Sequence, residues 1–335
     1  MTPTRDLSLF IVGAAGEGIQ TIGDVVSHAL LRSGIPVFTY QDYESRIRGG
    51  HSSYRIRAAG PNAPRHDADV LVSLNPSAAE QYAHSLSTGG LILGELSAGS
   101  SGASIPFREL AKERFGVPIL ANAIAAGALG ATVGLSADLL VTSLRDRLAK
   151  LSPEKLQQNE EAVRLGYQRA TEMISDRRRI EDAGESNGYV FVSAHDVLPL
   201  AAAAVGCRFM AAYPMSPSTG IITAFAHDPD LGVFVEQAED EIAAVNMAIG
   251  ASAAGARAMT ATSGGGFALM AEGLSLAGMT ETPLVIVIAQ RPGPATGLPT
   301  RTAQEDLLFA IFGGHGEFPR AVLAPSDPQE TVHLT

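Results

Sequence analysis

Short apolar segments that end in glycine-rich or polar turns alternate with helical segments along this chain, and no other feature constrains its fold as strongly. The segment LSLFIVG at residues 7–13 leads into a glycine-rich turn and an amphipathic helix, and PLVIVIAQ at 283–290 is an apolar run of strand length. Strands that alternate with helices are typical of layered α/β domains. Apolar strands are typical of parallel sheets that are buried on both faces. The sequence therefore predicts α/β domains with mostly parallel sheets.

The chain contains two such strand–helix series, separated by a charged stretch. Its 335 residues are enough for two domains. The stretch DRRRIEDAGESNG has almost no apolar side chains, which is typical of a linker. We therefore expect a first domain at 1–177, a linker at 178–189 and a second domain at 190–335. Because the second series stops where a helix begins after a strand, we expect this domain to be incomplete at its C-terminus.

The charge and cysteine content exclude several classes of protein. The formal net charge of −11 argues against a nucleic-acid-binding surface. The single cysteine, Cys207, excludes a disulfide framework, and it excludes an iron–sulfur cluster or structural zinc ligated by cysteines of this chain. A reducing cytoplasm is therefore the expected compartment.

Residues 117–141 form the most membrane-like part of the chain. The segment is rich in alanine, but Gly127, Gly130, Gly134 and Asp138 interrupt it. This pattern favours a buried Ala/Gly helix followed by a second helix over a membrane span.

A glycine-rich turn, GAAGEG, follows the first strand and contains Gly13, Gly16 and Gly18. A turn between a strand and a helix N-terminus presents backbone N–H groups that can bind an anion. The spacing G-x-x-G-x-G differs from the dinucleotide-binding spacing G-x-G-x-x-G. Two interpretations stay open, a site for a phosphate-bearing ligand and a purely structural turn.

A second glycine-containing segment, ESRIRGGHSS, carries Arg46, Arg48 and His51. Two arginines beside a glycine pair suit a phosphate or a carboxylate. The alternative is a solvated loop.

In the second half, the segment YPMSPST at 213–219 is a proline-stiffened loop after a strand. Ligands of open α/β sheets bind at the carboxyl ends of the strands. Ser216 offers a hydroxyl group there. The alternative is an ordinary turn that provides an N-cap at Ser218 or Thr219.

Three acids, of which Glu241 is the last, stand at the start of a helix rich in small residues. The helix dipole favours acids at this position, so capping alone would explain them. Alternatively, the small residues Ala244, Ala248 and Gly250 form a face that a cofactor ring or another chain approaches closely. Glu241 would then be a desolvated carboxyl group suited to proton exchange.

The segment QRPGPATGLPTRT at 290–302 contains Arg291 at a strand end, followed by Thr296, Thr300 and Arg301. A fixed arginine and hydroxyl groups suit a small carboxylate substrate. The alternative is a long surface loop with incidental charge.

These segments together resemble landmarks of a known family. In chain order they are GAAGEGIQ, SRIRGGHSSYRIR, AAYPMSPST, QAEDEIAAVNMAIGAS, TATSGGGF, QRPGPATGLPTRT and GGHGEFPR. The chain resembles the α subunit of 2-oxoacid:ferredoxin oxidoreductases, most closely the 2-oxoglutarate type. In that type an N-terminal γ domain is fused ahead of a pyrimidine-binding (PYR-type) domain. The family usually has a Gly-Asn-acid-Ala stretch at Ser193–Val197, and proline at the position of Gly265.

The resemblance implies coenzyme A-dependent oxidative decarboxylation of a 2-oxoacid, first of all 2-oxoglutarate, with electrons passed to ferredoxin. The cofactor would be thiamine diphosphate, shared with a β subunit that supplies Mg²⁺ and a 4Fe–4S cluster. The enzyme would be active only with that β subunit, as an (αβ)₂ heterotetramer in the cytoplasm. The chain would be a C-terminally truncated α subunit.

The resemblance also implies roles for individual residues. Glu241 would protonate the aminopyrimidine of the cofactor, and Arg291 would bind the substrate 1-carboxylate. Ser216 and Thr296 would line the reaction centre. The implied substrate contacts are Arg291, Thr300 and Arg301. The implied cofactor contacts are Tyr213, Pro214, Ser216, Glu241, Ser263 and Gly264. The implied coenzyme A side comprises Gly13, Gly16, Gly18, Arg46, Arg48 and His51.

Two other functions stay open on the residues alone. The first glycine turn could serve a nicotinamide-linked dehydrogenase, since Asp42 and Glu44 stand roughly where a ribose-binding acid would be. The chain could also be a non-catalytic assembly subunit of the same complex.

Overall fold

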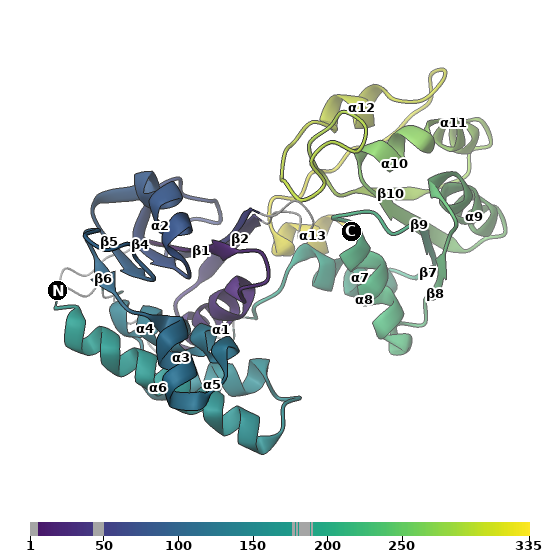
Figure 1. Cartoon of the computed structure of the whole chain (residues 1–335). Coiled ribbons are helices and arrows are strands. Elements are labelled where there is room, and N and C mark those ends of the chain that lie inside the picture. Colours follow the sequence, from purple (N-terminus) through teal and green to yellow (C-terminus); the bar gives the residue numbers. More distant parts are fainter. Residues whose placement is uncertain (1–5, 43–49, 176–177, 179, 181–187, 189) are drawn as a thin grey trace. The chain divides into compact units, whose positions relative to one another are not determined.

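In a computed structural model, the chain forms two compact units, one up to Phe191 and one from Val192 to Thr335 (Figure 1). The structure describes all residues except 1–5, 43–49, 176–177, 179, 181–187 and 189. Nine of the twelve residues of the expected linker at 178–189 therefore lie outside the described residues. Each unit has its own sheet and its own hydrophobic core.

The first unit contains a six-stranded sheet with the order β2-β3-β1-β4-β5-β6. Its strands are β1 (Leu7–Ala14), β2 (Val37–Asp42), β3 (His51–Ala58), β4 (Ala68–Ser73), β5 (Leu86–Gly94) and β6 (Ala103–Ser104). The pairs β1–β4, β4–β5 and β5–β6 are parallel, as predicted. Strand β3, however, runs antiparallel to both β1 and β2. Only residues 43–50 connect β2 to β3, and a parallel crossover needs a dozen residues or more.

Helices cover this sheet, and the longest of them is α6 (Pro153–Met173). The other helices of the unit are α1 (Ile19–Arg32), α2 (Pro76–Tyr82), α3 (Phe107–Phe115), α4 (Ala121–Thr132) and α5 (Ala137–Arg147), with 3-10 turns η1 (Ala83–Ser85) and η2 (Pro118–Leu120). Helix α4 is buried along almost its whole length and is followed by α5, which confirms the predicted buried Ala/Gly helix. Among the described residues, no helix combines the length and apolar character needed to cross a membrane.

Helices α4 and α6 pack closely because each has a glycine facing a backbone carbonyl of the other. A Cβ on Gly166 would lie 1.8 Å from the Ile124 carbonyl oxygen, and a Cβ on Gly127 would lie 2.0 Å from that of Val163. A side chain at either position would therefore push the two helices apart.

We expect Gly166→Ala to lower the free energy of unfolding by roughly 1–3 kcal/mol, the usual cost of overpacking a core. Chemical denaturation would measure it. Gly250→Ala is the matched control, because a Cβ at this exposed helical position meets no atom within 4 Å. Equal stability of Gly166→Ala and the wild-type chain would contradict the packing argument.

The second unit contains a four-stranded sheet with the order β10-β9-β7-β8, and all of its pairs are parallel. The strands are β7 (Cys207–Ala212), β8 (Phe234–Gln237), β9 (Arg257–Thr262) and β10 (Val285–Ile288). The helical elements are α7 (Ala194–Ala204), α8 (Thr219–His227), η3 (Pro229–Leu231), α9 (Glu241–Ala253), α10 (Gly264–Leu269), α11 (Ala271–Met279), α12 (Leu307–Phe312) and α13 (Pro328–Leu334). This arrangement confirms the predicted α/β class with a parallel sheet.

Candidate functional site

The carboxyl ends of the four parallel strands of the second unit lie at one edge of its sheet. The segments that leave this edge begin at Tyr213 after β7, Ala238 after β8, Ser263 after β9 and Ala289 after β10. The structure thus brings together, in one unit, the three motifs singled out in the second half of the sequence and the glycine run at 264–266.

Glu241 is the first residue of α9 and is only 3 % exposed. Its Oε1 atom has no hydrogen-bond partner among the described residues. The adjacent Asp240 caps the helix, because its Oδ1 accepts a hydrogen bond from the Ala243 N–H at 2.7 Å. Capping therefore explains Asp240 but not Glu241. An unpartnered buried carboxyl oxygen is costly, and such a group is ready to bind a ligand.

The carboxyl group of Glu241 packs against the glycine run that follows β9. A Cβ on Gly266 would lie 2.8 Å from Glu241 Oε1 and 2.0 Å from Thr262 Oγ1. On α9, Ala244 and Ala248 are fully buried on the same side as Glu241. Gly250 is exposed instead, so the predicted small-residue face does not include it.

Arg291 lies three residues beyond β10 and is only 8 % exposed. Its Nη1 donates a hydrogen bond of 2.8 Å to the carbonyl oxygen of Ser216, and its Nε is buried with no partner in the part of the chain that the structure describes. The guanidinium group therefore joins the loops after β7 and β10. The Ser216 side chain is exposed, so its contact with Arg291 is made by the backbone.

The loop that follows Arg291 is held against the rest of the unit. Glu305 Oε2 accepts a hydrogen bond from the Gly293 N–H at 2.7 Å and so closes the loop. The carbonyl oxygen of Ala295 lies 3.4 Å from the position that a Cβ on Gly265 would occupy. These contacts fix the loop, so the alternative of a long surface loop with incidental charge does not describe it. Within it Thr296 is exposed, whereas Thr300 and Arg301 are half-buried.

The implied cofactor contacts differ in their exposure. Ser263 is fully buried, and its Oγ finds no hydrogen-bond partner in the described residues. A Cβ on Gly264 would lie 2.0 Å from Asp306 Oδ1, so only glycine leaves room for that carboxyl group. Tyr213 is exposed and Pro214 is half-buried.

Several buried polar atoms that lack a hydrogen-bond partner within the described chain lie in the segments around this edge. They are Glu241 Oε1, Ser263 Oγ, Gln290 Oε1, Arg291 Nε and Asp306 Oδ2. Buried polar groups are almost always paired within a protein, so this concentration indicates a ligand-binding site. The sequence motifs contained no signal that distinguished Gln290 or Asp306, since burial without a partner is a tertiary property.

In the first unit, the glycine turn encloses the side chain of Glu17. Gly16 and Gly18 have left-handed backbone conformations, with φ of 93° and 76°, which favour glycine. Glu17 Oε2 accepts hydrogen bonds from the Ala14 N–H at 2.6 Å and from Asn75 Nδ2 at 2.9 Å. A Cβ on Gly13 would lie 2.6 Å from that same oxygen.

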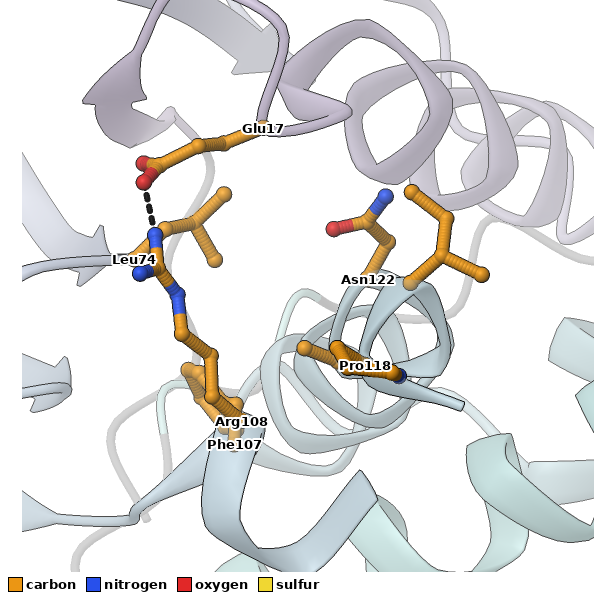
Figure 2. A pocket seen from close by; sticks show the side chains of 8 residues that line it. Glu17, Leu74, Phe107, Arg108, Pro118 and Asn122 are labelled. Carbon is orange, nitrogen blue, oxygen red and sulfur yellow. Dashed lines mark hydrogen bonds and ion pairs between the residues drawn. The ribbon is translucent and has the colours of Figure 1, made fainter. Parts of the chain in front are cut away.

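A small cavity of about 190 Å³ adjoins this turn. Figure 2 shows Arg108 paired with the carboxylate of Glu17, and Asn122 across the cavity from that pair. The remaining lining residues are Leu74, Phe107, Pro118, Ile119 and Ala121. The turn thus binds the carboxylate of Glu17, a residue of the turn itself, and the glycine spacing gave no indication of this contact.

His51 lies at the start of β3, opposite Ala14 of the glycine turn. Its Nδ1 lies 2.7 Å from Gln81 Oε1, and its Nε2 lies 3.0 Å from Ser77 Oγ. The ring is therefore held by residues of α2. Arg46 and Arg48 lie outside the described residues.

Two family models match the chain, one for each unit. Residues 8–169 match a model described as "Pyruvate ferredoxin/flavodoxin oxidoreductase". Residues 200–335 match a model described as "Pyruvate flavodoxin/ferredoxin oxidoreductase, thiamine diP-bdg".

Among curated proteins, the 2-oxoacid:ferredoxin oxidoreductase subunit alpha of Sulfolobus sp is 32% identical over 387 residues, covering 97% of this chain and 60% of that protein. The 2-oxoglutarate synthase subunit KorA of Methanocaldococcus jannaschii is 46% identical over 146 residues, covering 43% of this chain and 40% of that protein. A solved 2-oxoglutarate:ferredoxin oxidoreductase from Magnetococcus marinus, with 2-oxoglutarate, coenzyme A and succinyl-CoA bound, superimposes with a TM-score of 0.89. It is 35% identical, and the match covers 99% of this chain and 60% of that chain. The chain therefore spans about three-fifths of the length of the Sulfolobus subunit and of the Magnetococcus marinus chain.

Proposed function

The chain belongs to the family of 2-oxoacid:ferredoxin oxidoreductase α subunits, and we propose that it serves as such a subunit in the coenzyme A-dependent oxidative decarboxylation of a 2-oxoacid. Electrons would pass to ferredoxin. One observation carries this proposal. Glu241 and Arg291 are both buried in segments that follow strand ends of the same sheet, and each has a polar side-chain atom without a hydrogen-bond partner in the described residues. A carboxyl group for proton exchange and an arginine for a carboxylate are the two groups that this chemistry requires of the chain.

For the substrate we propose 2-oxoglutarate. Three 2-oxoglutarate synthase subunits KorA are 46% to 49% identical to this chain, over stretches of 131 to 147 residues. The superimposed oxidoreductase also has 2-oxoglutarate bound. Branched 2-oxoacids and pyruvate are the competing substrates that a test must include.

The residues at the sheet edge suit thiamine diphosphate, because Glu241 and Ser263 are buried with unpartnered oxygens beside a glycine run. The bound cofactor would supply a nucleophilic carbon and a sink for electrons. Glu241 would hold and transfer a proton at the aminopyrimidine. Tyr213, Pro214 and Gly264 would complete this chain's side of the cofactor site.

Arg291 would bind the 1-carboxylate of the substrate, and its bond to the Ser216 carbonyl would orient the guanidinium group. Thr300 and Arg301 would contact the remainder of the substrate. Ser216 and Thr296, which have exposed side chains, would line the reaction centre.

The same proposal assigns partner subunits to the chain and a role to its first unit. A β subunit would supply Mg²⁺, the diphosphate site and a 4Fe–4S cluster, in an (αβ)₂ assembly located in the cytoplasm. Residues 1–177 would be a γ-type domain and 190–335 a pyrimidine-binding domain. The γ-type domain would contact coenzyme A through residues of the glycine turn and of the segment ESRIRGGHSS. These residues are Gly13, Gly16, Gly18, Arg46, Arg48 and His51.

We expect this chain alone to show no 2-oxoacid-dependent dye reduction, because it has one cysteine and therefore no cysteine-ligated cluster. A complete α subunit that contains this sequence should gain the activity when a β subunit is added, with 2-oxoglutarate preferred over pyruvate. Turnover by the isolated chain would contradict the proposal. A stable complex without turnover would favour the assembly-subunit alternative.

A further inference from the structure

The carboxylate of Glu17 is held by donors from three separate elements of the first unit. Its Oε2 accepts hydrogen bonds from the Ala14 N–H, at the end of β1, and from Nδ2 of Asn75, the N-cap residue of α2. Its Oε1 pairs with the guanidinium group of Arg108 on α3 (Figure 2). Backbone N–H, side-chain amide and guanidinium groups are donors that proteins use to bind phosphate. The site therefore already holds an anion, and that anion belongs to the chain itself.

The side-chain donors are anchored independently of Glu17. Asn75 caps α2 through its Oδ1, which accepts a hydrogen bond from the Ala78 N–H at 2.8 Å, and this bond orients the amide group. The backbone N–H of Arg108 donates to Glu95 Oε1 at 2.8 Å, which ties the start of α3 to the strand β5 end. We therefore expect these donors to keep their places when the carboxylate of Glu17 leaves them.

Glu17 itself stands between two glycines. Gly16 and Gly18 both have left-handed φ angles, and glycine has the widest conformational freedom of all residues. A Cβ on Gly16 would meet no atom within 4 Å, so the space on that side of the turn is open. The side chain of Arg108 is 53% exposed, and ion pairs that face solvent contribute little to stability. Displacing the Glu17 carboxylate therefore costs little free energy.

The cavity of about 190 Å³ beside the carboxylate has room for the rest of a ligand. Leu74, Phe107 and Ile119 give it apolar walls. Asn122 lies across it from the ion pair (Figure 2). An apolar cavity of roughly 150 Å³ accommodates a benzene molecule, so this cavity can take a ring-sized group. A phosphate at the donors and an apolar or ring-sized group in the cavity together describe a phosphate ester.

We propose that Glu17 is a displaceable internal anion, and that the phosphate group of a phosphate ester replaces its carboxylate at the three donors. Under the proposed function the ester is coenzyme A, and the inference rests on that function for the identity of the ligand. Because the ligand must compete with Glu17, binding is weakened and release is favoured. Glu17 thus sets the affinity of the glycine turn for its ligand.

The test uses Glu17→Ala and Glu17→Gln in the complete α subunit, assembled with its β subunit and saturated with thiamine diphosphate. Alanine vacates the donors, and glutamine keeps the size of the side chain but removes its charge. Coenzyme A binding is measured by calorimetry and inorganic phosphate binding by phosphorus NMR. We expect both to bind roughly tenfold more tightly to Glu17→Ala, the effect of losing one competing charge-assisted contact, with a smaller gain in Glu17→Gln. Adding Arg108→Gln to Glu17→Ala should remove most of the gain.

Glu109→Gln is the matched control. It removes an exposed acid next to Arg108 on α3 without vacating the donors, so both affinities should stay nearly unchanged. If the ion pair were purely structural, both Glu17 variants would lower the melting temperature without any gain in binding. Unchanged or weaker phosphate binding in both Glu17 variants would overturn the inference. If phosphate binding tightens and coenzyme A binding does not, the anion site stands and the proposed coenzyme A role of the turn fails instead.

Discussion

Replacing Glu241 by glutamine in the complete α subunit with its β subunit is expected to slow 2-oxoacid decarboxylation by a factor of about 10² to 10⁴, the usual contribution of a positioned acid–base group. Glutamine has nearly the same shape but cannot exchange the proton. The direct measurement is the rate of hydrogen–deuterium exchange at the reactive carbon of thiamine diphosphate, together with turnover.

The stability of the same variant distinguishes this role from a structural one. Glu241 Oε1 has no partner in the described chain, so its replacement breaks no bond. We therefore expect the melting temperature and subunit assembly of Glu241→Gln to match those of the wild-type complex. Glu239→Gln, which changes an exposed acid two residues earlier, is the control and should keep its activity. Proton exchange at the wild-type rate in Glu241→Gln would refute the assignment.

For Arg291→Ala we expect kcat/KM for the 2-oxoacid to fall by roughly 30-fold to several thousand-fold. Truncating one partner of a buried, hydrogen-bonded charge pair costs about 2–5 kcal/mol. Lysine keeps the charge but loses the planar fork of the guanidinium group, so Arg291→Lys should restore only part of the activity. Steady-state kinetics of both variants would test this order.

Two further measurements separate substrate binding from folding. Thiamine diphosphate affinity should change little, because Arg291 is proposed to contact the substrate and not the pyrimidine. Loss of the bond to the Ser216 carbonyl should lower the free energy of unfolding by about 1.5–3 kcal/mol, the usual contribution of a hydrogen bond to a charged group, which is too little to unfold the complex. Normal 2-oxoacid kinetics in Arg291→Ala would rule out the carboxylate-binding role.

Local patterns in the sequence were sufficient to predict the α/β class, the strand that precedes residues 213–219 and the strand that leads to Arg291. Strand and helix periodicity depend on neighbouring residues, and so do turn signals. The buried Ala/Gly helix expected within residues 117–141, for example, is α4. The antiparallel course of β3 was not predicted, because the strand pattern of His51–Ala58 does not depend on the direction of its neighbours.

The sequence by itself determined which residues follow each strand end, and thereby most of the candidate site, including Glu241 and Arg291. Only the tertiary structure decided which of their polar atoms lack partners. The strand order places the segments after β8 and β10 at opposite ends of the edge. Within the glycine run after β9, Gly266 lies against Glu241, and Gly264 lies against Asp306. The Oδ2 atom of Asp306 is buried because the side chain lies against Gly264, which is distant in sequence. A local sequence pattern does not show such burial.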